Sequence, residues 1–330
     1  MLLELDADQR LWQETVRDAV GKQCPPSLVR SVAEDGADPA PLWKVYVDAG
    51  WTELTDPENA VELAIVLEEL GRATDPTPFL ATLTQFAPLV GDRFDPQQAG
   101  TAVYAGVTAY RDADGWILDG TAGHVLDGDR AERLAVVTAA GVFVVDADAV
   151  TIRRNEIFDP VLHVAEVSFN RLHLSDAERL TVDAERARHL ALTGMAMTMV
   201  GACQRILDLA LDHVKSRYQF GVPIGSFQAV QHKAADMHVA IERARALSYF
   251  AALTIAADDP RRRLAAAMAK ASAGECQSLV FRHGLQLFGA MGFTWENDLQ
   301  FALKRAKAGE HMLGGAAEHR ALIADEYRDF

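Results

Sequence analysis

Apolar residues recur every three or four positions through residues 1–100, which is the spacing of helices that bury one face. Proline and glycine interrupt the pattern and predict three helices, over about residues 8–24, 41–50 and 58–71, the first of them capped by Asp8. Glu68 and Glu69 fall near the end of the third helix, where we expect both carboxylates to be solvated.

Short apolar runs replace this pattern through residues 101–175. The runs lie near 102–110, 116–118, 134–138, 142–145 and 164–172. Turn signals fall between them, at Asp119-Gly120, Leu126-Asp127-Gly128 and Ala140-Gly141. No long helical pattern interrupts these runs, so we expect an antiparallel sheet or barrel rather than a Rossmann unit. Neither a GxGxxG motif nor a P-loop occurs in the chain.

Helical spacing returns after residue 180. It predicts helices over about 184–217, from 226 onward, over 260–289 and near 297–307. Four antiparallel helices with short connections indicate a bundle. The expected fold class is mainly α with a central β domain. We expect an N-terminal helical domain (1–100), a middle β-barrel domain (101–178) and a C-terminal four-helix bundle (179–330).

Charge and cysteine usage exclude several classes of function. The net charge of -15 disfavours nucleic acid and anionic membranes as partners, because both require a basic face. The three cysteines lie far apart without metal-ligand spacing, so we expect no metal site and a reducing compartment. No signal peptide pattern and no run of about 18 apolar residues occurs, so we expect a cytoplasmic protein without a membrane span.

The first candidate for chemistry is RYQFGVPIGSFQAVQH, over residues 217–232. It spans a helix end, a glycine-proline turn and the start of the next helix. The guanidinium of Arg217 can hold a diphosphate through two hydrogen bonds, and the amide of Gln228 can reach the same ligand. The alternative is a bundle turn with a surface arginine and a packed Phe220. His232 is interpreted as a structural residue of a packed helix.

The second candidate is QLFGAMGFTWE, over residues 286–296. Small residues at Gly289, Ala290 and Gly292 permit a ligand to approach the backbone closely. Gln286 lies one turn before them. The alternative is a helix C-cap followed by a glycine-rich exit.

Together the two segments resemble the acyl-CoA dehydrogenase family, whose pattern reads R-x-x-F-G-x-P-I-x-x-F-Q-x-x-Q-H and then Q-x-x-G-G-x-G-F-T-x-E. Ala290 stands in place of the second glycine. The resemblance implies a helical, β-barrel and helical-bundle fold, FAD, an acyl-CoA substrate and α,β-dehydrogenation. It also implies that FAD lies between two subunits, one of which holds the diphosphate and adenosine. This chain keeps five residues of that subunit, Arg217, Phe220, Gln228, Gln286 and Gly289, and Ala290 completes the expected cofactor-binding set.

The resemblance fails where the family places its catalytic base. Leu313 occupies the position of the usual glutamate, and Ala191 occupies the alternative base position. Neither side chain can accept a proton, so no catalytic residue is expected in this chain. Glu310 and Glu296 are the candidate substitutes. In the β domain, His124 stands where the family places a tryptophan against the flavin.

The leading hypothesis is a largely non-catalytic subunit that completes the FAD site of a heteromeric acyl-CoA dehydrogenase. The resemblance implies a longer paralogue as partner, in an α2β2 heterotetramer such as those that act on steroid side-chain CoA thioesters in lipid metabolism. The first alternative is a homomeric dehydrogenase with its base relocated to Glu310 or Glu296. The second is a flavin-free scaffold protein of the same fold.

Overall fold

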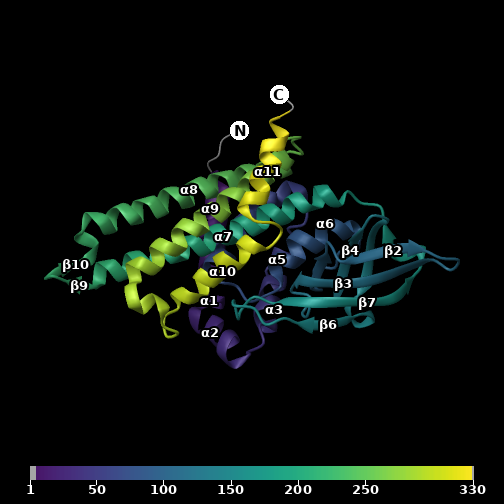
Figure 1. Cartoon of the computed structure of the whole chain (residues 1–330), viewed down its shortest axis with the longest axis horizontal. Coiled ribbons are helices and arrows are strands. Elements are labelled where there is room, and N and C mark those ends of the chain that lie inside the picture. Colours follow the sequence, from purple (N-terminus) through teal and green to yellow (C-terminus); the bar gives the residue numbers. More distant parts are fainter. Residues whose placement is uncertain (1–4, 329–330) are drawn as a thin grey trace. The chain divides into compact units, whose positions relative to one another are not determined.

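The computed structural model describes residues 5–328, which form two compact units (Figure 1). Unit 1 comprises residues 1–37, 57–75 and 192–330, and unit 2 comprises 38–56 and 76–191. The first hundred residues therefore contribute to both units. The three-domain division of the sequence stays a prediction.

Unit 1 is built from helices. They are α1 (Ala7–Gln23), α2 (Pro26–Asp35), α4 (Ala60–Ala73), most of α7 (Ala184–Ser216), α8 (Gln228–Ala256), α9 (Arg262–Phe288), α10 (Leu299–His311) and α11 (Ala316–Glu326). The long α7, α8, α9 and α10 confirm the expected bundle helices. Neither α2 nor α11 was expected, because the proline pair before α2 also reads as a stop and the apolar residues of α11 form no single stripe.

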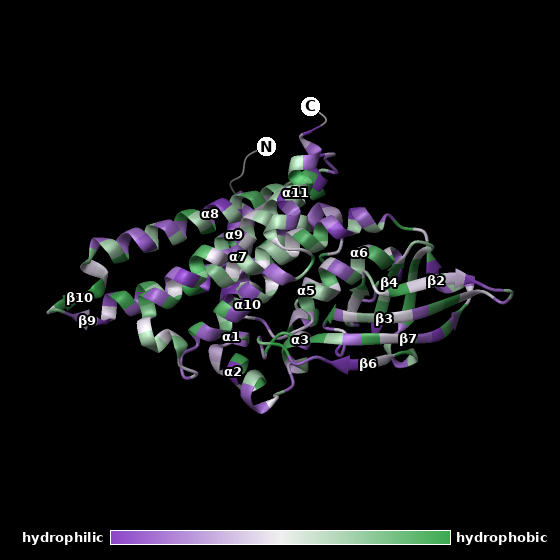
Figure 2. Cartoon of the chain, viewed as in Figure 1, coloured by the Kyte–Doolittle hydropathy of each residue, from purple (hydrophilic) through white to green (hydrophobic). Residues whose placement is uncertain are grey.

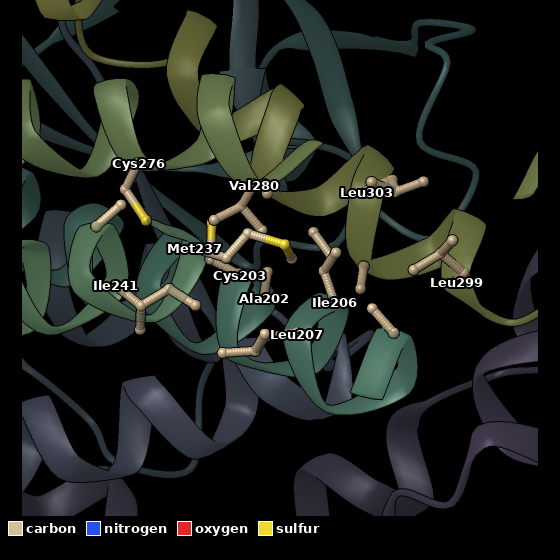
Figure 3. Close-up of a cluster of buried hydrophobic side chains, with 14 of the residues drawn as sticks. Ala202, Cys203, Ile206, Leu207, Met237, Ile241, Cys276, Val280, Leu299 and Leu303 are labelled. Carbon is tan, nitrogen blue, oxygen red and sulfur yellow. The ribbon is translucent and has the colours of Figure 1, made fainter. Parts of the chain in front are cut away.

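The bundle core lies among α7, α8, α9 and α10 (Figure 3). Cys203 and Ile206 of α7 meet Met237 of α8, Cys276 of α9 and Leu303 of α10, all essentially inaccessible to solvent. Cys24, Cys203 and Cys276 are free thiols. Helix α7 is long and apolar enough to cross a membrane, but 89% of its most apolar window is buried inside the protein, as in the core helix of a bundle.

Two sequence predictions at the N-terminal side of unit 1 are wrong. Asp6, not Asp8, caps α1: its carboxylate accepts a hydrogen bond from the Gln9 backbone, and the Gln9 side chain accepts one from the Asp6 backbone. Glu68 and Glu69 are buried rather than solvated, at 4% and 3% exposure. Their hydrogen-bonding cations, Arg245 and Arg17, come from distant segments, and only the longer 3.8 Å contact of Glu69 with Arg72 is local to α4.

Helices α4 and α7 approach so closely that glycine is required at their crossing. A Cβ atom at Gly201 would lie 1.9 Å from the carbonyl oxygen of Glu68, and one at Gly71 would lie 2.2 Å from that of Thr198. Both clashes are with backbone, which cannot rotate away. The two glycines therefore set the distance between these helices.

Replacing Gly201 by alanine is expected to lower the free energy of unfolding by about 1–3 kcal/mol, the usual cost of overpacking a core. Urea unfolding followed by circular dichroism measures it. Gly21 is the matched control, because a Cβ there would meet nothing within 4 Å. A Gly201→Ala protein as stable as the unmodified chain would contradict this packing.

Unit 2 contains α3 (Ala40–Asp48) and a helical segment formed by α5 (Phe79–Ala81), a π-helical turn (Thr82–Phe86) and α6 (Ala87–Val90). Its eight strands form two four-stranded sheets, in the orders β1-β4-β5-β8 and β2-β3-β7-β6. The strands are β1 (Gly100–Val103), β2 (Val107–Arg111), β3 (Trp116–Leu126), β4 (Arg133–Thr138), β5 (Gly141–Asp146), β6 (Thr151–Arg154), β7 (Val164–Leu174) and β8 (Arg179–Leu180).

The two sheets enclose a common apolar core, to which Leu134 and Phe143 contribute from one sheet and Leu118 and Val167 from the other. Figure 2 shows hydrophobic and hydrophilic residues along β3 and β7, as expected for strands with one buried face.

Two details of the β domain differ from the sequence prediction. The pair β1–β4 is parallel, because the chain passes through β2 and β3 before returning to the first sheet. The dipeptide Asp119-Gly120 lies inside β3 rather than in a turn, at an irregularity of the β3–β7 pairing. A dipeptide that favours a tight turn also suits a bulge, since both place glycine at positive φ.

Candidate functional site

A two-stranded hairpin follows α7 at one end of the bundle (Figure 1). Strand β9 (Tyr218–Gln219) pairs with β10 (Val222–Pro223), and the backbone N–H of Ile224 donates to the carbonyl of Arg217 at 2.8 Å. Phe220 and Gly221 turn the chain with φ of 54° and 80°. The expected glycine-proline turn is thus confirmed, with Arg217 at its start and Gln228 as the first residue of α8.

The second segment ends α9. Gly289 follows Phe288 with φ of 60°, and residues Gly289–Phe293 form a 3-10 turn. A Cβ added at Gly289 would meet nothing within 4 Å, so the backbone there is open to approach by another molecule.

A ring stack joins the two segments. The imidazole of His213, one turn before Arg217, lies parallel to the ring of Phe288, with centroids 4.5 Å apart. Burial, with a smaller contribution from the Arg217 guanidinium, lowers the pKa of His213 and favours the neutral ring. The stack therefore brings the start of the hairpin beside the end of α9.

The expected cofactor-binding residues share one property, which is that all are exposed in the chain by itself. They are Arg217, Phe220, Gln228, Gln286, Gly289 and Ala290. Phe220 is 92% exposed, so the alternative in which it packs in a bundle turn is wrong. His232 is exposed too, which contradicts a packed role. The sequence of a motif alone does not show which of its side chains are exposed to solvent in the fold.

The polar side chains at this end of the bundle fit a diphosphate. Among residues 5–328, the side chains of Arg217, Gln228 and Gln286 have no hydrogen-bond partner, so their donors are available to a ligand. A guanidinium and two side-chain amides offer N–H donors to phosphate oxygens, and the open backbone at Gly289 leaves room for the ligand. The donor set present therefore suits FAD.

A different group of polar side chains holds the loop between α10 and α11, which contains Leu313. Lys270 of α9 donates to the carbonyl of Gly314 at 2.7 Å, and Nε2 of His319 lies 3.0 Å from the carbonyl oxygen of Leu313. Glu310 accepts a hydrogen bond from the backbone of Ala316 at 3.0 Å. Leu313 itself has a φ of 57°, which is uncommon for a large side chain.

The two candidate substitute bases lie at opposite ends of α10. Glu296 is an exposed residue before this helix, and Glu310 belongs to its last turn. A helix of 13 residues is about 20 Å long, so the two carboxylates do not share a site. The Glu310 carboxylate packs against Gly274 of α9, where an added Cβ would collide with it. Its Oε1 accepts from the first N–H of α11, while Oε2 is buried without a hydrogen-bond partner in the described part of the chain.

The alternative base position, Ala191, is fully buried in α7, and its neighbour Leu192 is 5% exposed. Lys270 and His319 were missed by sequence reasoning. Lys270 could have been noticed, because it is a lone charge within a run of alanines that only a buried helix would carry. His319 has no such signal.

The buried Lys270 makes the stability of the protein depend on pH. Burial lowers the pKa of Lys270 from 10.5 to about 8, although Glu310 and Glu318 oppose the shift. Below about pH 8, Lys270 is protonated in the folded chain, and the cost of burying its ammonium group lowers the stability in full. This cost is relieved as pH rises from about 8 to 10.5, because the folded chain has lost the proton and the unfolded chain still holds it.

Over that window Lys270 is expected to raise the free energy of unfolding by up to about 1.4 kcal/mol per pH unit. The measurement is the difference in urea-unfolding free energy between the unmodified chain and Lys270→Met, since the difference removes the titration of other groups. A difference that stays constant between pH 7 and 10.5 would show that Lys270 titrates as an ordinary exposed lysine.

Comparison with known proteins agrees with these features. Residues 184–327 match the family model "Acyl-CoA dehydrogenase, C-terminal domain". The chain is 31% identical to "Acyl-CoA dehydrogenase IpdE2" of Mycolicibacterium smegmatis, with 98% of this chain and 100% of the relative covered. The chain belongs to the acyl-CoA dehydrogenase family. It is also 32% identical to the protein of the same name from Mycobacterium tuberculosis, over 94% of each chain.

Solved structures of this family share the fold. A chain of the ChsE4-ChsE5 complex from Mycobacterium tuberculosis superposes with a TM-score of 0.89 over all of both chains, at 23% identity. A chain described as "Tcur3481-Tcur3483 steroid ACAD G363A variant" gives 0.86 over 98% of both, at 26% identity. Members of the family bind FAD and are oxidoreductases that act on CH–CH bonds. Among residues 5–328, no group of three or more His, Cys, Asp or Glu side chains could hold a metal ion.

Proposed function

We propose that this chain is a subunit of a FAD-dependent, heteromeric acyl-CoA dehydrogenase and completes the FAD site of a longer paralogue. One observation carries the proposal. The exposed hairpin and the open end of α9 are joined by the His213–Phe288 stack, whereas Leu313 and Ala191 occupy the positions expected for the base. The chain thus keeps residues suited to a diphosphate and lacks those needed to remove a proton.

Arg217 would pair with the diphosphate through its guanidinium, and Gln228 and Gln286 would donate from α8 and α9. Gly289 and Ala290 would allow close approach, and Phe220 would cover an apolar part of the ligand. FAD held by these residues would supply the hydride acceptor for the α,β-dehydrogenation. In this chain the six residues would only bind and orient, since none of them has a carboxylate that could accept an α-proton.

The removal of the α-proton requires a carboxylate, and we assign it to the paralogue. One structural relative belongs to the two-protein ChsE4-ChsE5 complex and another is a steroid acyl-CoA dehydrogenase, which supports a heteromer and a steroid side-chain CoA thioester as substrate. In an α2β2 arrangement, each flavin would be bound by one copy of this chain and one copy of the paralogue.

Co-expression with a longer acyl-CoA dehydrogenase paralogue tests the assignment. The purified complex should be yellow and should dehydrogenate an acyl-CoA thioester, while this chain purified without a partner should be colourless or insoluble. Turnover of an acyl-CoA by this chain alone would overturn the proposal.

The variant Glu310→Gln distinguishes this proposal from a homomeric enzyme with a relocated base. Glutamine keeps the oxygen that accepts from Ala316, so the fold is retained. We expect kcat of the complex to be unchanged in Glu310→Gln and also in Glu296→Gln. A general base would instead be worth about 10²–10⁴ in rate. A loss of that size in either variant, with flavin still bound, would assign the base to this chain.

A further inference from the structure

Unit 1 contains a pocket whose lining includes no residue of the hairpin, of the end of α9 or of the Leu313 loop. Its volume is about 260 Å³, near the lower end of ligand-binding pockets. It lies among α1, α2, α4, α7 and α10, and its lining includes Val20, Cys24, Glu69, Arg205 and Phe301. The pocket is therefore formed entirely within one unit.

Part of the pocket lining is apolar. Val20, Val29, Phe301 and Ala302 form this part, and each is at most 3% exposed. Cys24 adds a buried thiol, whose pKa burial raises, so it remains protonated and behaves as a small apolar group. This part of the lining can contact a compact hydrocarbon group of a ligand.

The lining also includes three arginines, two of which have an acidic partner. Arg17 pairs with Glu69 at 2.7 Å, and Arg72 pairs with Asp208 at 2.6 Å. Arg205, half-buried on α7, makes no ion pair or hydrogen bond with any residue that the structure describes between 5 and 328. The pocket is left with one guanidinium that has no acceptor.

We propose that this pocket binds a small monocarboxylate with an apolar body, whose carboxylate pairs with Arg205. A guanidinium holds a carboxylate by two parallel hydrogen bonds. The apolar residues of the lining would contact the hydrocarbon part of the ligand. The two carboxylates that line the pocket already have partners, since Glu69 pairs with Arg17 and Asp298 pairs with Arg30. Among the described residues, Arg205 is therefore the one lining guanidinium left for the single negative charge of the ligand. The proposal does not depend on FAD or on a partner.

Titration calorimetry with cyclohexanecarboxylate as probe tests the proposal, using the full chain or its complex. We expect saturable one-site binding that weakens at least about tenfold in Arg205→Gln, because a charge-assisted hydrogen bond is lost. Arg243→Gln is the matched control, since Arg243 is an exposed arginine of α8 outside the pocket. It should bind the probe as the unmodified chain does.

A second variant reduces the pocket without weakening the fold. Gly21 lines the pocket within α1, and a Cβ there meets nothing within 4 Å. Gly21→Leu should abolish probe binding while its melting temperature is not lowered, because leucine favours helix more than glycine does. Absence of saturable binding to the unmodified chain would overturn the proposal, as would equal binding by Arg205→Gln. Equally tight binding of inorganic phosphate or of cyclohexylmethanol would contradict the ligand class.

Discussion

Replacement of Arg217 by alanine is expected to weaken FAD binding by the complex about 10- to 100-fold, because hydrogen bonds to a charged group contribute about 1.5–3 kcal/mol. Arg217 is the exposed residue that precedes β9, and its guanidinium has no hydrogen-bond or ion-pair partner among residues 5–328. We therefore expect the variant to keep the fold of the chain. Fluorescence titration of the flavin-free complex with FAD measures the change.

The control for this measurement is Arg243→Ala, which removes an exposed arginine of α8 that pairs with Glu275 at 2.7 Å. It should leave FAD affinity unchanged. Equal affinity of the Arg217→Ala and unmodified complexes would mean that this end of the bundle does not hold the cofactor, and would favour a scaffold role for the chain.

The second large effect concerns stability. Arg245 of α8 donates to Glu68 of α4 at 2.8 Å, and the hydroxyl of Tyr249 donates to the other oxygen of the same carboxylate at 3.1 Å. Replacing Arg245 by leucine leaves the buried Glu68 charge without its cation. We expect the free energy of unfolding to fall by about 3–5 kcal/mol, measured by urea unfolding at pH 7.

The double variant Arg245→Leu/Glu68→Leu should recover most of that loss, because an apolar pair no longer buries an uncompensated charge. Arg243→Leu, which breaks an exposed pair on the same helix, should cost at most about 1 kcal/mol. If the single and double variants of the buried pair were equally unstable, lost packing rather than an unpaired carboxylate would be the cause.

Glu68 also shows where the sequence stops being informative about the fold. The stripes of α7, α8 and α9 and the proline and glycine between them predict those helices, because helix periodicity is a local property. Burial of Glu68 and Glu69 depends on Arg245, 177 residues away, and on Arg17, 52 residues away. The one local cation, Arg72, contacts Glu69 only at 3.8 Å, so the hydrogen-bonding partners could not be read from the helix itself. The glutamate pair was therefore wrongly expected to be solvated.

The candidate site, too, could be predicted from the sequence only in part. Both of its segments were predicted through their resemblance to the acyl-CoA dehydrogenase pattern, because arginine, glutamine and glycine at those spacings also suit a plain bundle turn and a helix C-cap. Their proximity through His213 and Phe288 could not, because those side chains belong to helices joined only by the tertiary fold. The support of the Leu313 loop by Lys270 and His319 was missed for the same reason.

The flavin content of purified protein tests the central claim most directly. Absorbance at the flavin band, divided by the amount of each chain, should show no FAD on this chain alone. In the complex with the longer paralogue it should show half as many flavins as chains, and far fewer when Arg217→Ala is present. A homo-oligomer of this chain with one FAD on every chain would contradict the account.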